Sequence, residues 1–332
     1  MKWTKRTSSW AALAVVALAA ASARAAVIAP GYTVTQIPLS DFAAGDVVVV
    51  GDALFVGVGA SFVGGLQSVV RIDAGGTTVV ATGFQGLGGM AYDAANNRLL
   101  VSDNALEAPG AVTGDTVFAV PAPLGAFPVP VAAAGSELLA AGTLPGAADI
   151  QLDPGDPSGD KLFATDSTTN EVLRIALGAG TVTAILPTTG FAAGLAADAA
   201  TLWFGDVAYD ASYNANGTVS AVPLPGAGMP DELTTGLPGQ YDLELASDGS
   251  LLATAGGALV RIDPLTGATT TLATGFGFAT GLFEADGTIW LLDGGFPGLA
   301  AVYQLTAIPE PGMASLLALG LALLARRARA RR

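Results

Sequence analysis

The chain has 332 residues, with 28 acidic against 14 basic ones, and it contains neither histidine nor cysteine. It therefore has no imidazole base, no thiolate nucleophile, no disulfide, and no soft or borderline ligands for zinc, copper or iron. The oxygen ligands that remain suit calcium or magnesium.

The first 25 residues have the pattern of a secretory signal peptide. A positively charged start is followed by an apolar stretch from Trp10 to Ala21, and Ala23-Arg24-Ala25 has the small-x-small form of a cleavage site. We expect residues 1–25 to be removed by signal peptidase, which leaves residues 26–308 as the folded domain.

The next segment, residues 32–37, alternates in the manner of a β-strand and has no partner nearby in the sequence. A repeated unit follows it, built from a short apolar run, a turn, and a second run that ends near an aspartate. Residues 89–93 thus lead to 99–103, and residues 149–153 lead to 162–166.

The repeated unit occurs six times. Its starting positions are Asp46, Gly89, Asp149, Gly194, Asp242 and Gly281. Intervals of 39 to 60 residues between them are typical of the four-stranded blades of a propeller. The longest interval contains residues 104–114, rich in Ala, Pro and Gly, which we expect to be a loop inserted between the second and third strands.

An Arg-Ile step marks the third strand of three units, at Arg71, Arg174 and Arg261. Together these repeats resemble the NHL-type and gluconolactonase-like six-bladed propellers. The resemblance implies an all-β fold, a six-bladed β-propeller of four-stranded antiparallel blades. The last unit reaches Pro309 with only three strands, so we predict that residues 32–37 close its blade beside residues 301–306.

The starting positions alternate between aspartate and glycine, so that every second blade points a carboxylate at the channel. Three like charges at one channel mouth repel one another unless a cation lies among them or their pKa values rise. One interpretation is that Asp46, Asp149 and Asp242 bind a divalent cation, Ca²⁺ being the best fit. The other is that each aspartate accepts hydrogen bonds from backbone amides of the neighbouring blade, as this position does in many NHL-type repeats.

The resemblance to gluconolactonase-like enzymes implies a metal held over the channel by acidic and amide side chains. The Asn-Gly and Asp-Gly ligand motifs of those enzymes are not reproduced here, since Gly88 and Ala148 stand one residue before the repeat position.

A second acidic cluster occupies residues 153–160, in the turn between the first two strands of the third unit. Asp153, Asp156 and Asp160 are candidate calcium ligands, although their spacing departs from the helix-loop-helix calcium pattern. Because Pro, Gly, Ser and Asp are also typical turn residues, a purely structural turn is the alternative.

Residues 209–216 form a polar insertion that carries two tyrosines. We consider Tyr209, Tyr213 and Asn214 the best candidates for contact with a carbohydrate or protein partner.

The last residues have three parts: Pro309-Glu310-Pro311, an uncharged run over residues 312–325, and five arginines between 326 and 332. The order resembles the PEP-CTERM sorting signal that exosortase-like enzymes process in Gram-negative-type bacteria. The fourteen-residue run makes a helix of roughly 21 Å, short for a bilayer core of about 30 Å. We expect residues 309–332 to anchor the chain transiently in the inner membrane, with a short basic tail as the alternative.

Without both terminal signals, the domain keeps five basic and twenty-seven acidic residues, a net charge of −22. Such a body repels nucleic acid, which excludes that class of partner, and it attracts cations or basic partners; solubility alone also explains it. Two functions remain open: a non-enzymatic binding or extracellular-matrix module at the cell surface, or a calcium-dependent lactone or ester hydrolase.

Overall fold

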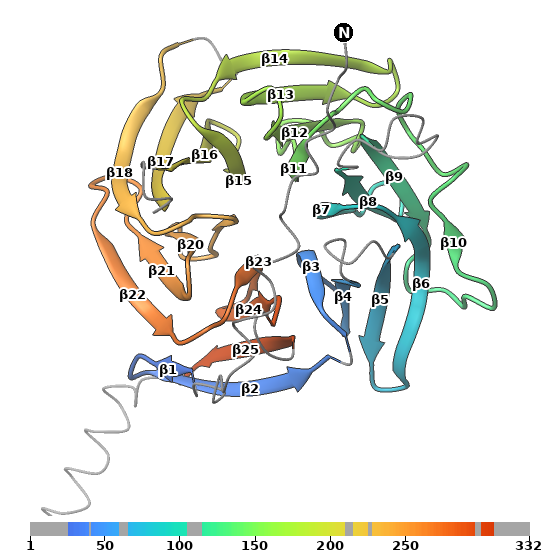
Figure 1. The fold of residues 1–332 in the computed structure, drawn as a ribbon, viewed down its shortest axis with the longest axis horizontal. Coiled ribbons are helices and arrows are strands. Elements are labelled where there is room, and N and C mark those ends of the chain that lie inside the picture. The colour runs from blue at the N-terminus through green and yellow to red at the C-terminus, as the bar shows by residue number, and fades with distance from the viewer. Residues whose placement is uncertain are drawn as a thin grey trace, which may run out of the picture.

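The computed structural model describes residues 26–39, 41–59, 66–104, 115–209, 215–224, 228–295 and 300–308. These residues form six β-sheets arranged as the blades of a propeller around a central channel (Figure 1). Blades are numbered here by the order of their inner strands along the chain.

The first three blades take up the N-terminal half of the ring. The first blade contains β3 (Ala43–Val50), β4 (Ala53–Val58), β5 (Gln67–Asp73) and β6 (Gly76–Phe84). The second contains β7 (Leu87–Asp93), β8 (Arg98–Asp103) and β9 (Thr116–Pro121). The third contains β11 (Ala147–Leu152), β12 (Lys161–Asp166), β13 (Glu171–Ala176) and β14 (Thr181–Pro187).

The other three blades complete the ring. The fourth contains β15 (Phe191–Ala197), β16 (Thr201–Tyr209), β17 (Ala215–Pro223) and β18 (Asp231–Leu237). The fifth contains β19 (Leu243–Leu245), β20 (Leu251–Ala255), β21 (Ala258–Ile262) and β22 (Thr269–Thr274). The sixth contains β23 (Ala279–Ala285), β24 (Thr288–Asp293), β25 (Ala301–Ala307) and, from the other end of the domain, β2 (Tyr32–Pro38).

The predicted closure of the ring is confirmed. β2 pairs with β25 in antiparallel register from Tyr32 opposite Ala307 to Pro38 opposite Ala301, and Figure 1 shows the two strands side by side. The N-terminal strand therefore supplies the outer edge of the sixth blade, and the two ends of the domain are joined by strand pairing.

The second blade corrects the prediction of four strands in every blade. After β9 the chain runs through Pro123, Pro128 and Pro130, which lack the N–H groups that a fourth strand must donate. Among the described residues, the edge of β9 is partly covered by residues 136–138. Phe118 and Glu137 form an isolated bridge there, and the Ala119 and Leu138 amides donate to the carbonyls of Ser136 and Val117.

Two short strands add to other blades. β10 (Val131–Ala132) lies parallel to β6 on the outside of the first blade, and β1 (Val27–Ile28) pairs antiparallel with β22 of the fifth. Neither was expected, because a two-residue strand leaves no periodic pattern in a sequence.

The hydrophobic core is divided among the six blade-to-blade interfaces. Each of six buried clusters takes its residues from two neighbouring blades. Between the first and second blades, for example, Phe84 meets Phe118 edge to face at 5.4 Å between ring centroids. Such packing arises because alternate side chains of one strand face opposite neighbours, so each blade contributes to two clusters.

Candidate functional site

The six repeat positions lie in or next to the inner strands that surround the channel. Five of them occur at β-bulges, where the register with the second strand shifts; Asp242 directly precedes β19. The expectation that these residues open their strands is wrong for those five, because the strands begin two or three residues earlier. A β-bulge changes the direction in which a side chain points. Here the bulges lie at the contacts between neighbouring blades.

Two of the three channel aspartates use both carboxylate oxygens on backbone amides. Asp46 accepts hydrogen bonds from the Val47 amide at 2.6 Å and, across the blade interface, from the Met90 amide at 3.0 Å. Asp149 accepts them in the same way from Ile150 and Leu195, both at 2.7 Å. The amide interpretation of this position is therefore confirmed for Asp46 and Asp149.

The glycines of the alternate blades make these contacts sterically possible. A Cβ atom on Gly89 would lie 2.3 Å from Oδ1 of Asp149, and one on Gly194 would lie 2.4 Å from the amide nitrogen of Leu243. At Gly281 the nearest atom would be Cα of Asp46, at 2.8 Å. The Asp-Gly alternation thus joins the blades in pairs, because the aspartate requires a glycine on the adjacent strand.

Asp46, Asp149 and Asp242 line one cavity of about 230 Å³ in the channel, as the sequence predicted, and Glu244 joins them. The alternation does not include Glu244, so the sequence pattern missed it. Within the part of the chain that the structure describes, no three acidic side chains converge closely enough to enclose a metal ion. Calcium binding by Asp46, Asp149 and Asp242 stays a prediction.

Burial gives these carboxyl groups unusual pKa values. Burial raises the pKa of Asp46 to about 7, although the amides of Met90 and Val47 act to lower it. Burial, followed by the charge of Asp46, raises the pKa of Asp149, Asp242 and Glu244 well above the usual range. These carboxyl groups therefore keep their protons to a higher pH than exposed acids do.

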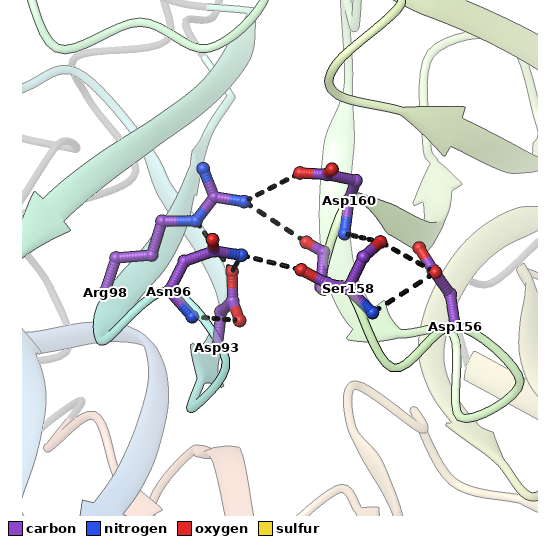
Figure 2. Close-up of polar contacts among 7 residues, drawn as sticks. Asp93, Asn96, Arg98, Asp156, Ser158 and Asp160 are labelled. Carbon is purple, nitrogen blue, oxygen red and sulfur yellow. Dashed lines mark hydrogen bonds and ion pairs between the residues drawn. The ribbon is translucent and has the colours of Figure 1, made fainter.

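The second acidic cluster fastens the third blade to the second (Figure 2). Asp160 lies 3.5 Å from Arg98 of β8, whose Nε also donates to buried Asp93 at 2.7 Å. The Nδ2 group of Asn96 donates to the Ser158 carbonyl and to Asp93, both at 2.7 Å.

The other acids of that turn also have partners. Buried Asp153 forms an ion pair with Arg174 of β13 and accepts from the Gly155 amide at 2.9 Å. Asp156 accepts from the hydroxyl of Ser158 at 2.7 Å, a bond that lowers the pKa of Asp156. These carboxylates are already bonded to arginines, amides and a hydroxyl group, as the structural-turn alternative expects. Calcium binding by Asp153, Asp156 and Asp160 stays a prediction.

The predicted partner-binding loop is described only at its edge. Tyr213 and Asn214 lie outside the described residues, whereas Tyr209, at the end of β16, is 51% exposed. Tyr209 hydrogen-bonds to Tyr241, and burial followed by that bond raises the pKa of Tyr241 to about 12. Tyr241 in turn meets Phe278, with 5.0 Å between ring centroids.

These three side chains, Tyr209, Tyr241 and Phe278, form what we call the aromatic row. They come from the fourth blade and from the segments that lead into the fifth and sixth blades. The sequence pattern indicates only its first member, because the other two stand alone in their segments.

The two predicted terminal signals, residues 1–25 and 309–332 with Pro309, Glu310 and Pro311, lie outside the described residues. Their assignments stay predictions. Where the structure describes the chain, it contains no helix with the length and apolarity needed to cross a bilayer.

No protein-family model matches the chain, and no curated protein does. Solved structures do match it. A gluconolactonase from Xanthomonas campestris superposes with a TM-score of 0.59 over 86% of this chain and 91% of its own, at 13% identity. A PQQ-bound aldose sugar dehydrogenase from Streptomyces coelicolor gives 0.55 over 85% and 100%, at 15% identity. A family AA12 carbohydrate-active enzyme from Trichoderma reesei gives 0.60 over 86% and 98%, at 12%. At such identities the likeness establishes the propeller fold alone.

Proposed function

We propose that this chain is an exported, surface-displayed propeller that acts as a non-enzymatic binding or extracellular-matrix module. The observation that carries the proposal is the use of Asp46 and Asp149, whose carboxylate oxygens are all bonded to backbone amides. Carboxylates engaged in this way stiffen the ring and are poor candidates for catalytic metal ligands. The channel therefore serves mainly to hold a scaffold together.

The aromatic row is the proposed binding surface. Aromatic side chains offer large contact area at low entropic cost, and tyrosine adds a polar hydroxyl. A net charge of −22 on residues 26–308 disfavours nucleic acid and anionic polymers. The proposed partner is an uncharged or basic exopolysaccharide, or a surface protein that presents such a surface.

Tyr209→Ala tests this surface. We expect it to weaken binding to neutral polysaccharide at least about fivefold, measured by affinity electrophoresis, because a lost ring contact contributes on the order of 1 kcal/mol or more. Leu265→Ala is the matched control, since Leu265 is 91% exposed and lies outside the aromatic row. Equal mobility of the Tyr209→Ala variant and the native protein in every polysaccharide that retards the native protein would contradict the proposal.

The proposed route to the surface uses both terminal signals. Signal peptidase removes residues 1–25, and the tail holds the chain in the inner membrane of a Gram-negative-type bacterium until an exosortase-like enzyme acts near Pro309-Glu310-Pro311. Deletion of residues 309–332 is expected to release the protein from cells. Mass spectrometry of surface protein that still carries an intact Arg-rich end would argue against processing.

A divalent-metal-dependent hydrolase of lactones or esters is the second candidate, and the four carboxyl groups around one cavity favour it. Under the binding proposal, calcium causes no turnover of lactones, and Asp149→Ala lowers only thermal stability. Calcium-dependent turnover that disappears in Asp149→Ala, in protein that is still folded, would replace the binding proposal with this one.

A further inference from the structure

Asp242 breaks the pattern that Asp46 and Asp149 follow. Its Oδ1 accepts from the Leu243 amide at 2.7 Å, but its Oδ2 is buried and has no hydrogen-bond partner in the described part of the chain. By analogy with the other two aspartates, its second donor should be the amide of Leu282 in the next blade. That amide instead hydrogen-bonds to Asp46. One buried carboxylate oxygen in the channel is thus left without a donor, although only 6% of Asp242 is exposed.

The cavity beside this oxygen is suited to a cation. Its walls combine the polar groups of Asp242, Glu244 and Gln151 with apolar side chains such as Met90 and Phe283. None of the described residues that line it is basic. A volume of about 230 Å³ has room for roughly seven waters, or for an organic group of similar size.

We propose that this cavity binds an alkylammonium group, with Asp242 and Glu244 as its acceptors. An ammonium has three N–H donors, and the free oxygen of Asp242, the carboxylate of Glu244 and the amide oxygen of Gln151 supply three acceptors. The alkyl chain packs against the apolar wall. This site is separate from the aromatic row, so either proposal can fail without the other.

The same donor set argues against a metal ion as the occupant. Calcium takes six to eight oxygens, whereas the oxygens of Asp46 and Asp149 are already bonded to amides. An ammonium needs half as many acceptors and tolerates the apolar side of the cavity.

Binding is linked to proton release. The titratable groups around the cavity are Asp46, Asp149, Asp242, Glu244 and Tyr92, with Glu284 next to Glu244. Burial, together with the charges of Asp46 and Asp149, raises the pKa of Asp242 and Glu244, so these two groups retain protons to a higher pH than exposed acids. When protonated, Asp242 can donate to the neighbouring Asp46 carboxyl group, an interaction that acts to lower the pKa of Asp46. An incoming ammonium replaces these protons, and its affinity therefore rises with pH.

Calorimetry on the exported protein tests the proposal with n-butylammonium as the probe and n-butanol as its uncharged counterpart. We expect n-butylammonium to bind at least about tenfold more tightly at pH 8 than at pH 6, and n-butanol not to bind. Asp242→Asn should weaken n-butylammonium at least tenfold. Asp286→Asn removes one exposed charge outside the cavity and should leave binding unchanged.

A second arm separates the two sources of an ammonium group. Binding of n-butylammonium with rejection of Nα-acetyl-lysine amide identifies a free amine as the ligand, and the reverse result identifies a lysine side chain of a partner; both support the site. If Asp242→Asn does not fold, Glu244→Gln takes its place. No heat from either ammonium compound at pH 8, native affinity in the Asp242→Asn variant, or heat from Ca²⁺ alone would overturn the proposal.

Discussion

At the scale of single residues, the inner ring depends on the fit between aspartates and glycines of different blades. Asp46 binds the amide that follows Gly89, and Gly89 in turn leaves room for Asp149. A hydrogen bond to a carboxylate contributes about 1.5–3 kcal/mol, and the glycine makes that contact possible. Each such aspartate therefore stabilises the interface between its own blade and the next blade.

Gly89→Ala tests this fit. The added Cβ would lie 2.3 Å from Oδ1 of Asp149, so we expect a loss of about 1–3 kcal/mol in the free energy of unfolding, measured by chemical denaturation. Gly228→Ala is the matched control, because nothing lies within 4 Å of the Cβ position there. Equal stability of the two variants would show that the ring tolerates a side chain at position 89.

The raised pKa of Asp46 predicts how stability changes with pH. The folded protein keeps a proton on Asp46 up to a pH of about 7, whereas the unfolded chain loses it near 3.8. The folded state therefore binds more protons between these values, and the associated stability is complete below about pH 4 and is lost as pH rises through 7.

We accordingly expect a lower melting temperature at pH 8 than at pH 5, measured by differential scanning calorimetry. Asp46→Asn cannot titrate, so it should flatten this part of the profile. A native profile that rises between pH 5 and pH 8 would contradict the assignment.

At the scale of elements, β2 is the strand on which the ring depends. It belongs to the sixth blade although it precedes all the others in sequence, and it covers the edge of β25 along its whole length. An uncovered strand edge promotes aggregation. The sixth blade is therefore complete only when β2, from the N-terminal end of the domain, has paired with β25.

A disulfide tests this pairing without interference, since the chain has no native cysteine. Thr33 and Thr306 are register partners, so Thr33→Cys with Thr306→Cys should form a bond under mild oxidation and raise the melting temperature by several degrees. Thr33→Cys with Gln304→Cys is two residues out of register and should remain reduced on a non-reducing gel. Bond formation by the second pair alone would place β2 in another register.

At the scale of the whole molecule, negative charge dominates. Of the five basic residues between positions 26 and 308, the four arginines each form an ion pair with an aspartate, among them Arg174 with Asp153 and Arg261 with Asp248. Most of the acidic residues therefore have no basic counterpart within the domain, which repels itself.

Added salt is expected to raise the melting temperature by a few degrees between 0.02 and 0.5 M NaCl, because it screens this repulsion. CaCl₂ at equal ionic strength distinguishes screening from a specific site. An identical rise in both salts speaks against the calcium predictions for Asp149 and Asp153, and a clearly larger rise with CaCl₂ supports them.

The sequence by itself determined the number of blades, the order of most strands and the strand that closes the ring. Those features are local: a strand alternates with a period of two, turn residues interrupt it, and the unit repeats often enough to be counted. Residues 32–37 could be placed because the last unit lacked a strand. The second blade was predicted less well, since the effect of its prolines depends on where the chain goes next.

Only the tertiary structure decided what the channel aspartates do. The cross-blade partners of Asp46 and Asp149 lie on strands some 45 residues away, and β-bulges set the direction of both side chains. Neither feature leaves a local pattern in the sequence. Asp46, Asp149 and Asp242 are equivalent in sequence, yet only Asp242 keeps a carboxylate oxygen without a donor. A hydrogen bond between blades depends on the positions of its donor and acceptor to within a fraction of an ångström. Those positions are fixed only when the ring is closed.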